Sequence, residues 1–197
     1  MHILICAEDA ARASVIEEAL EAHDDACDER PFVVHRIDRL SRLLANIAST
    51  KPDAILVDLG EPTPESISLL TVTATSVKRP IVAFVDRSDS ASARKAIDAG
   101  VAAYVVDGLR KERIRPLLTV AVTRHEAMRR LETELERAQT ALRERKLIDR
   151  AKAILMAREG LTEQAAYALL RRTAMNQNRR IADLARAIID ASALLSD

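Results

Sequence analysis

Short apolar runs alternate with longer amphipathic stretches through the first 115 residues of the chain. The runs are too short for helices, rich in valine and isoleucine, and without polar alternation, which is typical of strands buried on both faces of a parallel sheet. Together with the helix-length stretches between them, they predict an α/β domain with a doubly wound, five-stranded parallel sheet. The expected strands cover residues 3–6, 32–34, 54–57, 81–85 and 102–106, and the expected helices lie near 10–22, 39–49, 64–77 and 90–99.

The pattern changes after Pro116, because no glycine or proline occurs from Leu117 to Glu159. A single helix over this segment would be about 65 Å long at 1.5 Å per residue. Its apolar residues recur at intervals of three, four and seven, which predicts a homodimeric coiled coil. The alternative is a helix that lies on the chain's own sheet. The seam residues would be Ala121, Met128, Leu131, Leu135, Ala138 and Leu142.

The last part of the chain has the pattern of a small helical bundle. Gly160 would end the long helix, and Thr162 would cap a second helix over residues 163–173. A last helix near residues 179–195 carries one apolar face. The expected parts are a sheet domain over 1–115, a coiled-coil helix over 116–144 and a three-helix bundle over 145–197.

Basic and acidic residues cancel over the whole chain, with 30 of each. Their distribution is uneven, because residues 1–115 carry a net charge of −4 and residues 145–197 a net charge of +4. The basic end removes the objection that a neutral chain would not bind nucleic acid. Only two tyrosines, two phenylalanines and no tryptophan occur, which argues against recognition of bases by an aromatic stacking platform.

Several classes of protein are disfavoured. Cys6 and Cys27 cannot by themselves build a disulfide framework or a zinc site. No apolar run approaches the roughly 20 residues of a membrane span, so we expect a cytoplasmic protein with no membrane partner. An enzyme is the least favoured class, because the chain has no glycine-rich phosphate loop and no histidine pair at metal-binding spacing.

Carboxylates follow two of the expected strands. Glu8 and Asp9 come directly after the first strand, and Asp58 ends the third. In a sheet of order 2-1-3-4-5 these strands are neighbours, so the three carboxylates would meet at one edge. We expect no cofactor other than a Mg²⁺ ion at this edge, where one carboxylate could also accept a phosphoryl group.

Residues 1–115 resemble a response-regulator receiver domain. Asp58 matches the phosphoacceptor, Glu8 and Asp9 match the acidic pair, and Tyr104 matches the switch aromatic. The resemblance implies the receiver fold, with Asp58 as the site of phosphorylation.

The chain departs from the receiver pattern at three positions. Val85 replaces a hydroxyl residue, Asp107 replaces a lysine, and Gly108 replaces a proline. The lysine and the hydroxyl would normally stabilise the phosphoryl oxygens. We therefore expect a scaffold that is controlled by a protein partner more than by phosphorylation.

Basic and amide side chains gather in the C-terminal region. A cation at the start of a helix opposes the macrodipole, so an anion facing Arg179 and Arg180 would relieve that cost. Amide side chains can pair with base edges. The alternative is a solvated charged face without a ligand. The candidate RNA-binding residues are Lys146, Arg150, Lys152, Arg171, Arg172, Asn176, Gln177, Asn178, Arg179 and Arg180.

The same region has a long motif. Its features are Ile148–Asp149, Ala151–Lys152, Leu155–Met156, Glu163/Ala166/Tyr167, Arg171/Ala174/Met175 and the helix from Ile181. With these features it resembles an ANTAR domain, whose members bind hairpin loops in leader RNA and prevent terminator formation. The whole layout is similar to the NasT-type regulators of nitrate and nitrite assimilation, which a nitrate-sensing partner protein holds inactive.

The resemblance implies an antitermination regulator whose partners are leader mRNA hairpins, a nitrate-sensing protein and, in the active state, a second copy. A phosphorylation-dependent DNA-binding response regulator and a pure interaction protein are the alternatives.

Overall fold

The computed structural model describes residues 1–21, 31–107 and 109–194 of the chain. It divides into two compact units, Met1–Arg129 and Arg130–Asp197, each of which is described by itself. Cys27 and Gly108, which were named above, lie outside the described residues.

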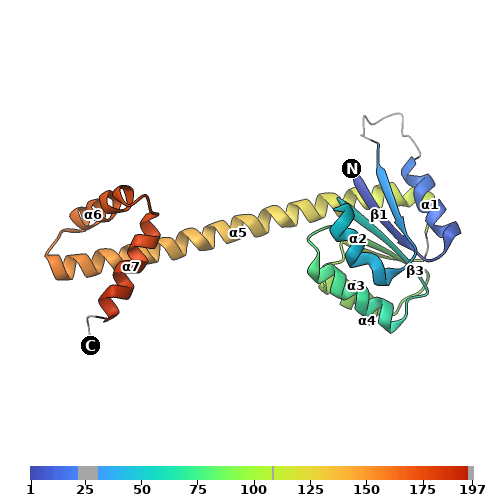
Figure 1. The fold of residues 1–197 in the computed structure, drawn as a ribbon. Helices are drawn as coiled ribbons and strands as arrows, with labels where there is room; N and C mark the ends of the chain where they lie inside the picture. The colour runs from blue at the N-terminus through green and yellow to red at the C-terminus, as the bar shows by residue number, and fades with distance from the viewer. Residues whose placement is uncertain (22–30, 108, 195–197) are drawn as a thin grey trace. The chain divides into compact units, whose positions relative to one another are not determined.

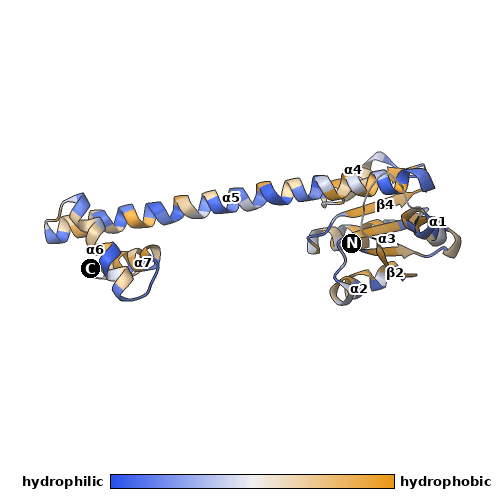
Figure 2. Ribbon diagram, turned by 90° about the horizontal axis from the view of Figure 1, so that it is seen from above, coloured by the Kyte–Doolittle hydropathy of each residue, from blue (hydrophilic) through white to orange (hydrophobic). Residues whose placement is uncertain are grey.

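The first unit is built on a five-stranded sheet of order β2-β1-β3-β4-β5 in which every pair of neighbours is parallel. All residues of β4 are buried, and the sheet is predominantly orange in Figure 2. Burial on both faces explains why the strands read as continuous apolar runs. The predicted doubly wound sheet and its strand order are confirmed. The strands are β1 (His2–Ala7), β2 (Val33–Ile37), β3 (Ala54–Gly60), β4 (Ile81–Val85) and β5 (Ala103–Val106).

Helices cover both faces of this sheet (Figure 1). On one face, α1 (Ala10–Glu21) and the first turns of α5 (Lys111–Glu159) enclose a buried apolar cluster. A second cluster lies on the opposite face, beneath the remaining helices. These are the 3-10 helix η1 (Leu40–Arg42), α2 (Leu43–Thr50), α3 (Pro64–Ser76) and α4 (Ser90–Asp98).

The long helix α5 begins earlier than the boundary at Pro116 that the sequence suggested. Its first residue is Lys111, and Pro116 lies inside the helix, where it removes one backbone donor. Ile114, Leu118 and Ala121 are buried against the sheet, and this packing offsets the lost hydrogen bond. Ala121, which the heptad pattern placed in the coiled-coil seam, therefore belongs to the core of the first unit.

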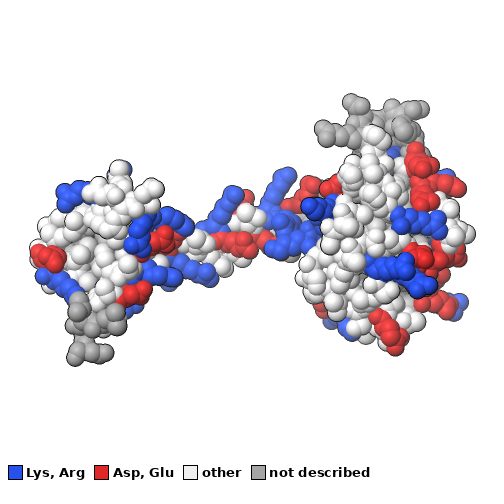
Figure 3. Space-filling model, in the orientation of Figure 1, with Lys and Arg blue, Asp and Glu red and all other residues white. Residues whose placement is uncertain are grey.

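The other large seam residues of α5 are exposed in the single chain. Met128 is 60% exposed, Leu131 62%, Leu135 59% and Leu142 55%. Basic and acidic side chains are mixed along this part of the helix (Figure 3). We use the name seam below for these four residues.

The second unit contains α6 (Glu163–Asn176) and α7 (Ile181–Leu194), which pack with the last turns of α5. Gly160 follows α5 with a left-handed φ of 65°, as expected of a residue that ends a helix. Thr162 caps α6, because its Oγ1 accepts a hydrogen bond from the N–H of Ala165 at 3.3 Å. The core residues of this unit are Ala151, Leu170, Ala174, Leu184 and Ala185.

The turn between α6 and α7 is set by Asn178, whose φ is 49°. Its N–H donates to the carbonyl of Met175 at 3.1 Å, and the next N–H donates to the carbonyl of Ala174 at 2.9 Å. These two bonds form a Schellman motif, and asparagine tolerates the left-handed conformation that the motif needs. α7 therefore begins after Arg179 and Arg180, two residues later than expected.

Candidate functional site

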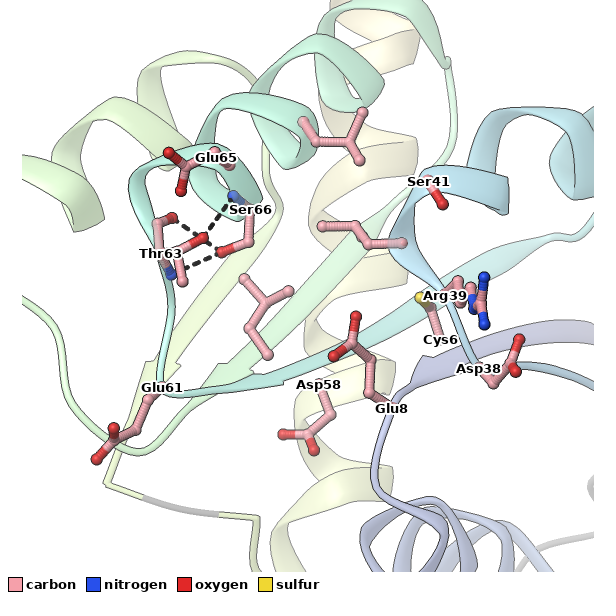
Figure 4. Close-up of a pocket in the computed structure, with 13 residues that line it drawn as sticks. Cys6, Glu8, Asp38, Arg39, Ser41, Asp58, Glu61, Thr63, Glu65 and Ser66 are labelled. Atoms are coloured by element: carbon pink, nitrogen blue, oxygen red, sulfur yellow. Dashed lines mark hydrogen bonds between the residues drawn. The ribbon is translucent and has the colours of Figure 1, made fainter.

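The carboxyl ends of β1 and β3 border an acidic cavity of about 600 Å³ in the first unit (Figure 4). A doubly wound sheet places its working residues at this edge. The thiol of Cys6 also lines the cavity, and burial, followed by the nearby carboxylates, raises its pKa to about 12, so it stays protonated at neutral pH. The charged lining residues are Glu8, Asp38, Arg39, Asp58, Glu61 and Glu65.

Asp58 is paired with an arginine that the sequence analysis missed. Nε of Arg12 donates to Asp58 Oδ2 at 2.5 Å, and Nη2 of Arg12 donates to Oδ1 at 2.7 Å. The same guanidinium reaches Asp86 after β4, with Nη1 donating to Oδ2 at 3.0 Å. The hydrogen bond to Asp58 is the main reason why the pKa of Arg12 is raised above its ordinary value. The planar guanidinium of Arg12 thus donates hydrogen bonds to both oxygens of Asp58, whose side chain is only 2% exposed.

The expected Mg²⁺ ion does not fit this arrangement. Magnesium needs oxygen ligands in a near-octahedral shell, whereas both oxygens of Asp58 already accept hydrogen bonds from Arg12. Asp9 Oδ1 accepts the N–H groups of Ala11 and Arg12 at 2.7 and 3.3 Å, and so caps the first turn of α1. Within the described residues, no three His, Cys, Asp or Glu side chains are grouped to hold a metal ion. The structure therefore does not support a metal site of Glu8, Asp9 and Asp58.

A signal for Arg12 was present in the sequence. It lies in the first turn of α1, where a cation opposes the helix macrodipole. The sequence did not reveal the partners of Arg12, because Asp58 and Asp86 are 46 and 74 residues away along the chain.

Tyr104, at the position that matches the switch aromatic of receivers, has a hydroxyl partner in the loop after β4. Val85, at the expected hydroxyl position, is fully buried in β4. Ser88, three residues later, shares a hydrogen bond of 2.9 Å with the Tyr104 hydroxyl. The ring of Tyr104 is therefore held from the loop after β4.

In the second unit, one face of α6 combines an aromatic ring with basic and amide groups. Tyr167 is 46% exposed and Met175 is 69% exposed. Since residues four apart share a helix face, Tyr167, Arg171 and Met175 form one row. A shallow cavity of about 390 Å³ lies along this row. Its lining, which we call the α6 face, consists of Tyr167, Ala168, Arg171, Arg172, Met175 and Asn176.

Residues 136–189, which contain the α6 face, match the family model of the ANTAR domain. This part of the chain is therefore similar to ANTAR domains. It is 29% identical to the transcriptional regulatory protein PdtaR of Mycobacterium tuberculosis over 140 residues, which are 71% of this chain and 68% of that protein. It is also 36% identical to the nitrate regulatory protein of Klebsiella oxytoca over 80 residues, which are 41% of this chain and 20% of that protein.

Solved structures agree on the fold of the first unit. A response regulator receiver domain protein from Methanospirillum hungatei has a TM-score of 0.53 at 17% identity, covering 64% of this chain and 97% of its own. A two-component response regulator from Clostridium difficile has a TM-score of 0.52 at 18% identity, covering 63% of this chain and 97% of its own. The first unit of this chain thus has the receiver fold.

Two of the ten candidate RNA-binding residues of the ANTAR domain are occupied by other contacts. Nζ of Lys152 lies 2.7 Å from Asp149 Oδ1 and 2.7 Å from Glu163 Oε1, so it joins α5 to the first turn of α6. Its side chain is only 14% exposed. Arg180 is paired with Glu144 of α5. These two residues are better explained as links within the bundle than as contacts to a ligand.

The remaining basic candidates are exposed and form no ion pair with any other residue that the structure describes. Arg171 and Arg172 belong to the α6 face, and Asn176 ends the same helix. Tyr167 was not among the candidates, because the low aromatic content argued against stacking. The structure gives the ANTAR domain one exposed ring beside two unpaired arginines. The unpaired basic candidates are Lys146, Arg150, Arg171, Arg172 and Arg179.

Replacing Lys152 with methionine is expected to lower the melting temperature of the protein and leave its affinity for nucleic acid unchanged. The hydrogen bonds to Asp149 and Glu163 raise the pKa of Lys152, and Lys152 lowers the pKa of Asp149, so each charged form stabilises the fold. Circular dichroism and a gel-shift assay measure the two effects. Arg143→Met is the matched control, since Arg143 is exposed, is not a candidate RNA-binding residue and has no ion pair among the described residues. A loss of affinity in Lys152→Met at full stability would contradict this assignment.

Along the described residues, no helix has the length and apolar character needed to cross a membrane. Hydrophilic residues recur along the length of α5 (Figure 2).

Proposed function

We propose that this protein is a transcription antitermination regulator whose ANTAR domain binds hairpin loops in leader RNA and prevents terminator formation. The α6 face carries this proposal. Unpaired loop bases can stack on an exposed ring such as Tyr167, and an amide such as Asn176 can pair with a base edge. Arg171 and Arg172 supply the positive charge that phosphate binding requires.

The active form in this proposal is a homodimer that pairs through the seam. Apolar side chains at spacings of three and four, such as Met128, Leu131 and Leu135, fit the holes of a second identical helix. Pairing would bury side chains that are more than half exposed in the single chain. Two linked ANTAR domains would then bind a transcript with two hairpins more tightly than either domain alone.

Genes of nitrate and nitrite assimilation are the proposed targets, and a nitrate-sensing partner protein is the proposed regulator. Two observations support this step: the likeness of the layout to NasT-type regulators, and the identity with the nitrate regulatory protein of Klebsiella oxytoca. Control by a partner is favoured over phosphorylation because Val85 and Asp107 remove two groups that bind phosphoryl oxygens. The place of action would be the cytoplasm, where leader transcripts are made.

A competition assay tests the RNA-binding step. Full-length protein is mixed with a labelled RNA that contains two hairpins, and unlabelled duplex DNA of the same sequence is the competitor. We expect RNA to be retained at a large excess of DNA, with a salt dependence of about 0.7 in log–log slope for each phosphate contact. Displacement by DNA would instead favour the DNA-binding response regulator, in which Arg179 and Arg180 before α7 would approach the groove.

A further inference from the structure

The guanidinium of Arg12 lies at the acidic edge of the sheet in the first unit. Arg12 bridges the ends of two neighbouring strands, with hydrogen bonds to Asp58 of β3 and to Asp86 after β4. We infer that Arg12 serves as the resident cation of this edge in place of Mg²⁺, and that it blocks phosphoryl transfer to Asp58. This inference is independent of the RNA-binding function proposed above.

The burial of Asp58 explains why a cation is needed. A carboxylate that is 2% exposed must be paired, because the loss of water around an ionised group is otherwise costly. A guanidinium cannot be deprotonated in a protein, so the compensation by Arg12 is permanent and independent of metal concentration. A divalent ion beside the guanidinium would bring like charges together at the same carboxylate, which disfavours its binding.

The backbone of α1 keeps Arg12 in this position. The side chain of Asp9 accepts the N–H of Arg12 at 3.3 Å, which fixes the first turn of the helix. The guanidinium opposes the helix macrodipole there, but Asp58 and Asp86 offset that cost with four nitrogen-to-oxygen contacts of 2.5–3.0 Å. Because the side chain is 25% exposed, it is also within reach of a reagent in solution.

Phosphoryl transfer to Asp58 would need one of its oxygens to be free. Transfer from acetyl phosphate forms a bond between phosphorus and a carboxylate oxygen, breaks the bond between phosphorus and the acetyl oxygen, and releases acetate. Arg12 holds Oδ1 at 2.7 Å and Oδ2 at 2.5 Å, so both attacking oxygens are engaged. The block on these two oxygens is therefore local to Arg12 and adds to the loss of the phosphoryl-binding groups at positions 85 and 107.

Removal of the guanidinium is the direct test. We expect Arg12→Ala to melt at a lower temperature than the wild type. Millimolar Mg²⁺ or methylguanidinium should restore part of the loss, because either cation can pair with the Asp58 carboxylate that has lost its partner. The wild type should respond to neither cation. The double variant Arg12→Ala/Asp58→Asn should lose the response, since no buried carboxylate remains. Arg36→Ala is the matched control, as it removes only a half-exposed arginine 3.9 Å from Glu17.

A second test needs only the wild type. It is treated with acetyl phosphate and Mg²⁺, and its intact mass shows whether Asp58 accepts a phosphoryl group. We expect the unmodified mass for the full-length wild type. Stoichiometric phosphorylation of the wild type, or a wild-type melting temperature that rises with Mg²⁺, would overturn the inference whether or not Arg12→Ala folds. An Arg12→Ala protein that folds and is stabilised by neither cation would also overturn it.

Discussion

Replacement of both Leu131 and Leu135 with glutamate is expected to make the protein monomeric and to lower its affinity for a two-hairpin RNA by about 10²–10⁴-fold. Both side chains are about 60% exposed in the single chain and lie four residues apart on α5. In a paired coiled coil they would be buried, and four carboxylates placed in the shared seam would repel one another. The ANTAR domains would remain folded, because the core of the second unit does not include either leucine.

Sedimentation and gel-shift titration measure the two effects of the seam variant. The affinity for an RNA with a single hairpin should change little, which separates lost avidity from lost recognition. The control is Thr133→Glu together with Thr140→Glu. It adds the same charge to α5, but both positions lie on the side of the helix away from the seam. A wild type that is monomeric at all concentrations tested, with full RNA affinity, would contradict the dimer.

Tyr167→Ala is expected to weaken binding of each hairpin by about 5- to 150-fold, because the stacking of a base on an aromatic ring contributes about 1–3 kcal/mol. The ring is 46% exposed and lies four residues before Arg171 on α6. Arg171→Ala should weaken binding as well, and should reduce the salt slope by about 0.7 if one phosphate contact is lost. Both losses should be seen with RNA that carries one hairpin.

Tyr167→Phe retains the ring and should retain most of the affinity. Arg186→Ala, which removes an exposed arginine from α7, is the control for loss of charge alone. Gel shifts over a series of salt concentrations give affinity and slope together. Equal affinity of Tyr167→Ala and the wild type would remove the α6 face from the RNA interface.

The receiver sheet could be predicted because its central strands β1, β3 and β4 are buried on both faces, which leaves uninterrupted apolar runs in the sequence. The end of α5 and the start of α6 could also be predicted, because single residues, Gly160 and Thr162, encode them. By contrast, the start of α5 was misplaced at Pro116. Proline is a local signal for a boundary, but burial of Ile114 and Leu118 against the sheet carries the helix through it.

The candidate site was predicted less well than the fold. The sequence correctly placed Asp58 at the edge where the carboxyl ends of the strands lie, since strand order alone fixes that position. It also identified the ANTAR domain and its basic residues. It did not distinguish Lys152, which joins two helices, from Arg171, which is unpaired among the described residues.

The sequence by itself determined the sheet, the long helix, the bundle and the likeness of its last part to ANTAR domains, because these depend on periodicity and on motifs that are contiguous in the chain. Only the tertiary structure decided which charges neutralise one another. Arg12 meets Asp58 and Asp86 across 46 and 74 residues, and Arg180 meets Glu144 across 36. An ion pair depends on distances between side chains from separate elements, and those distances exist only once the elements have packed.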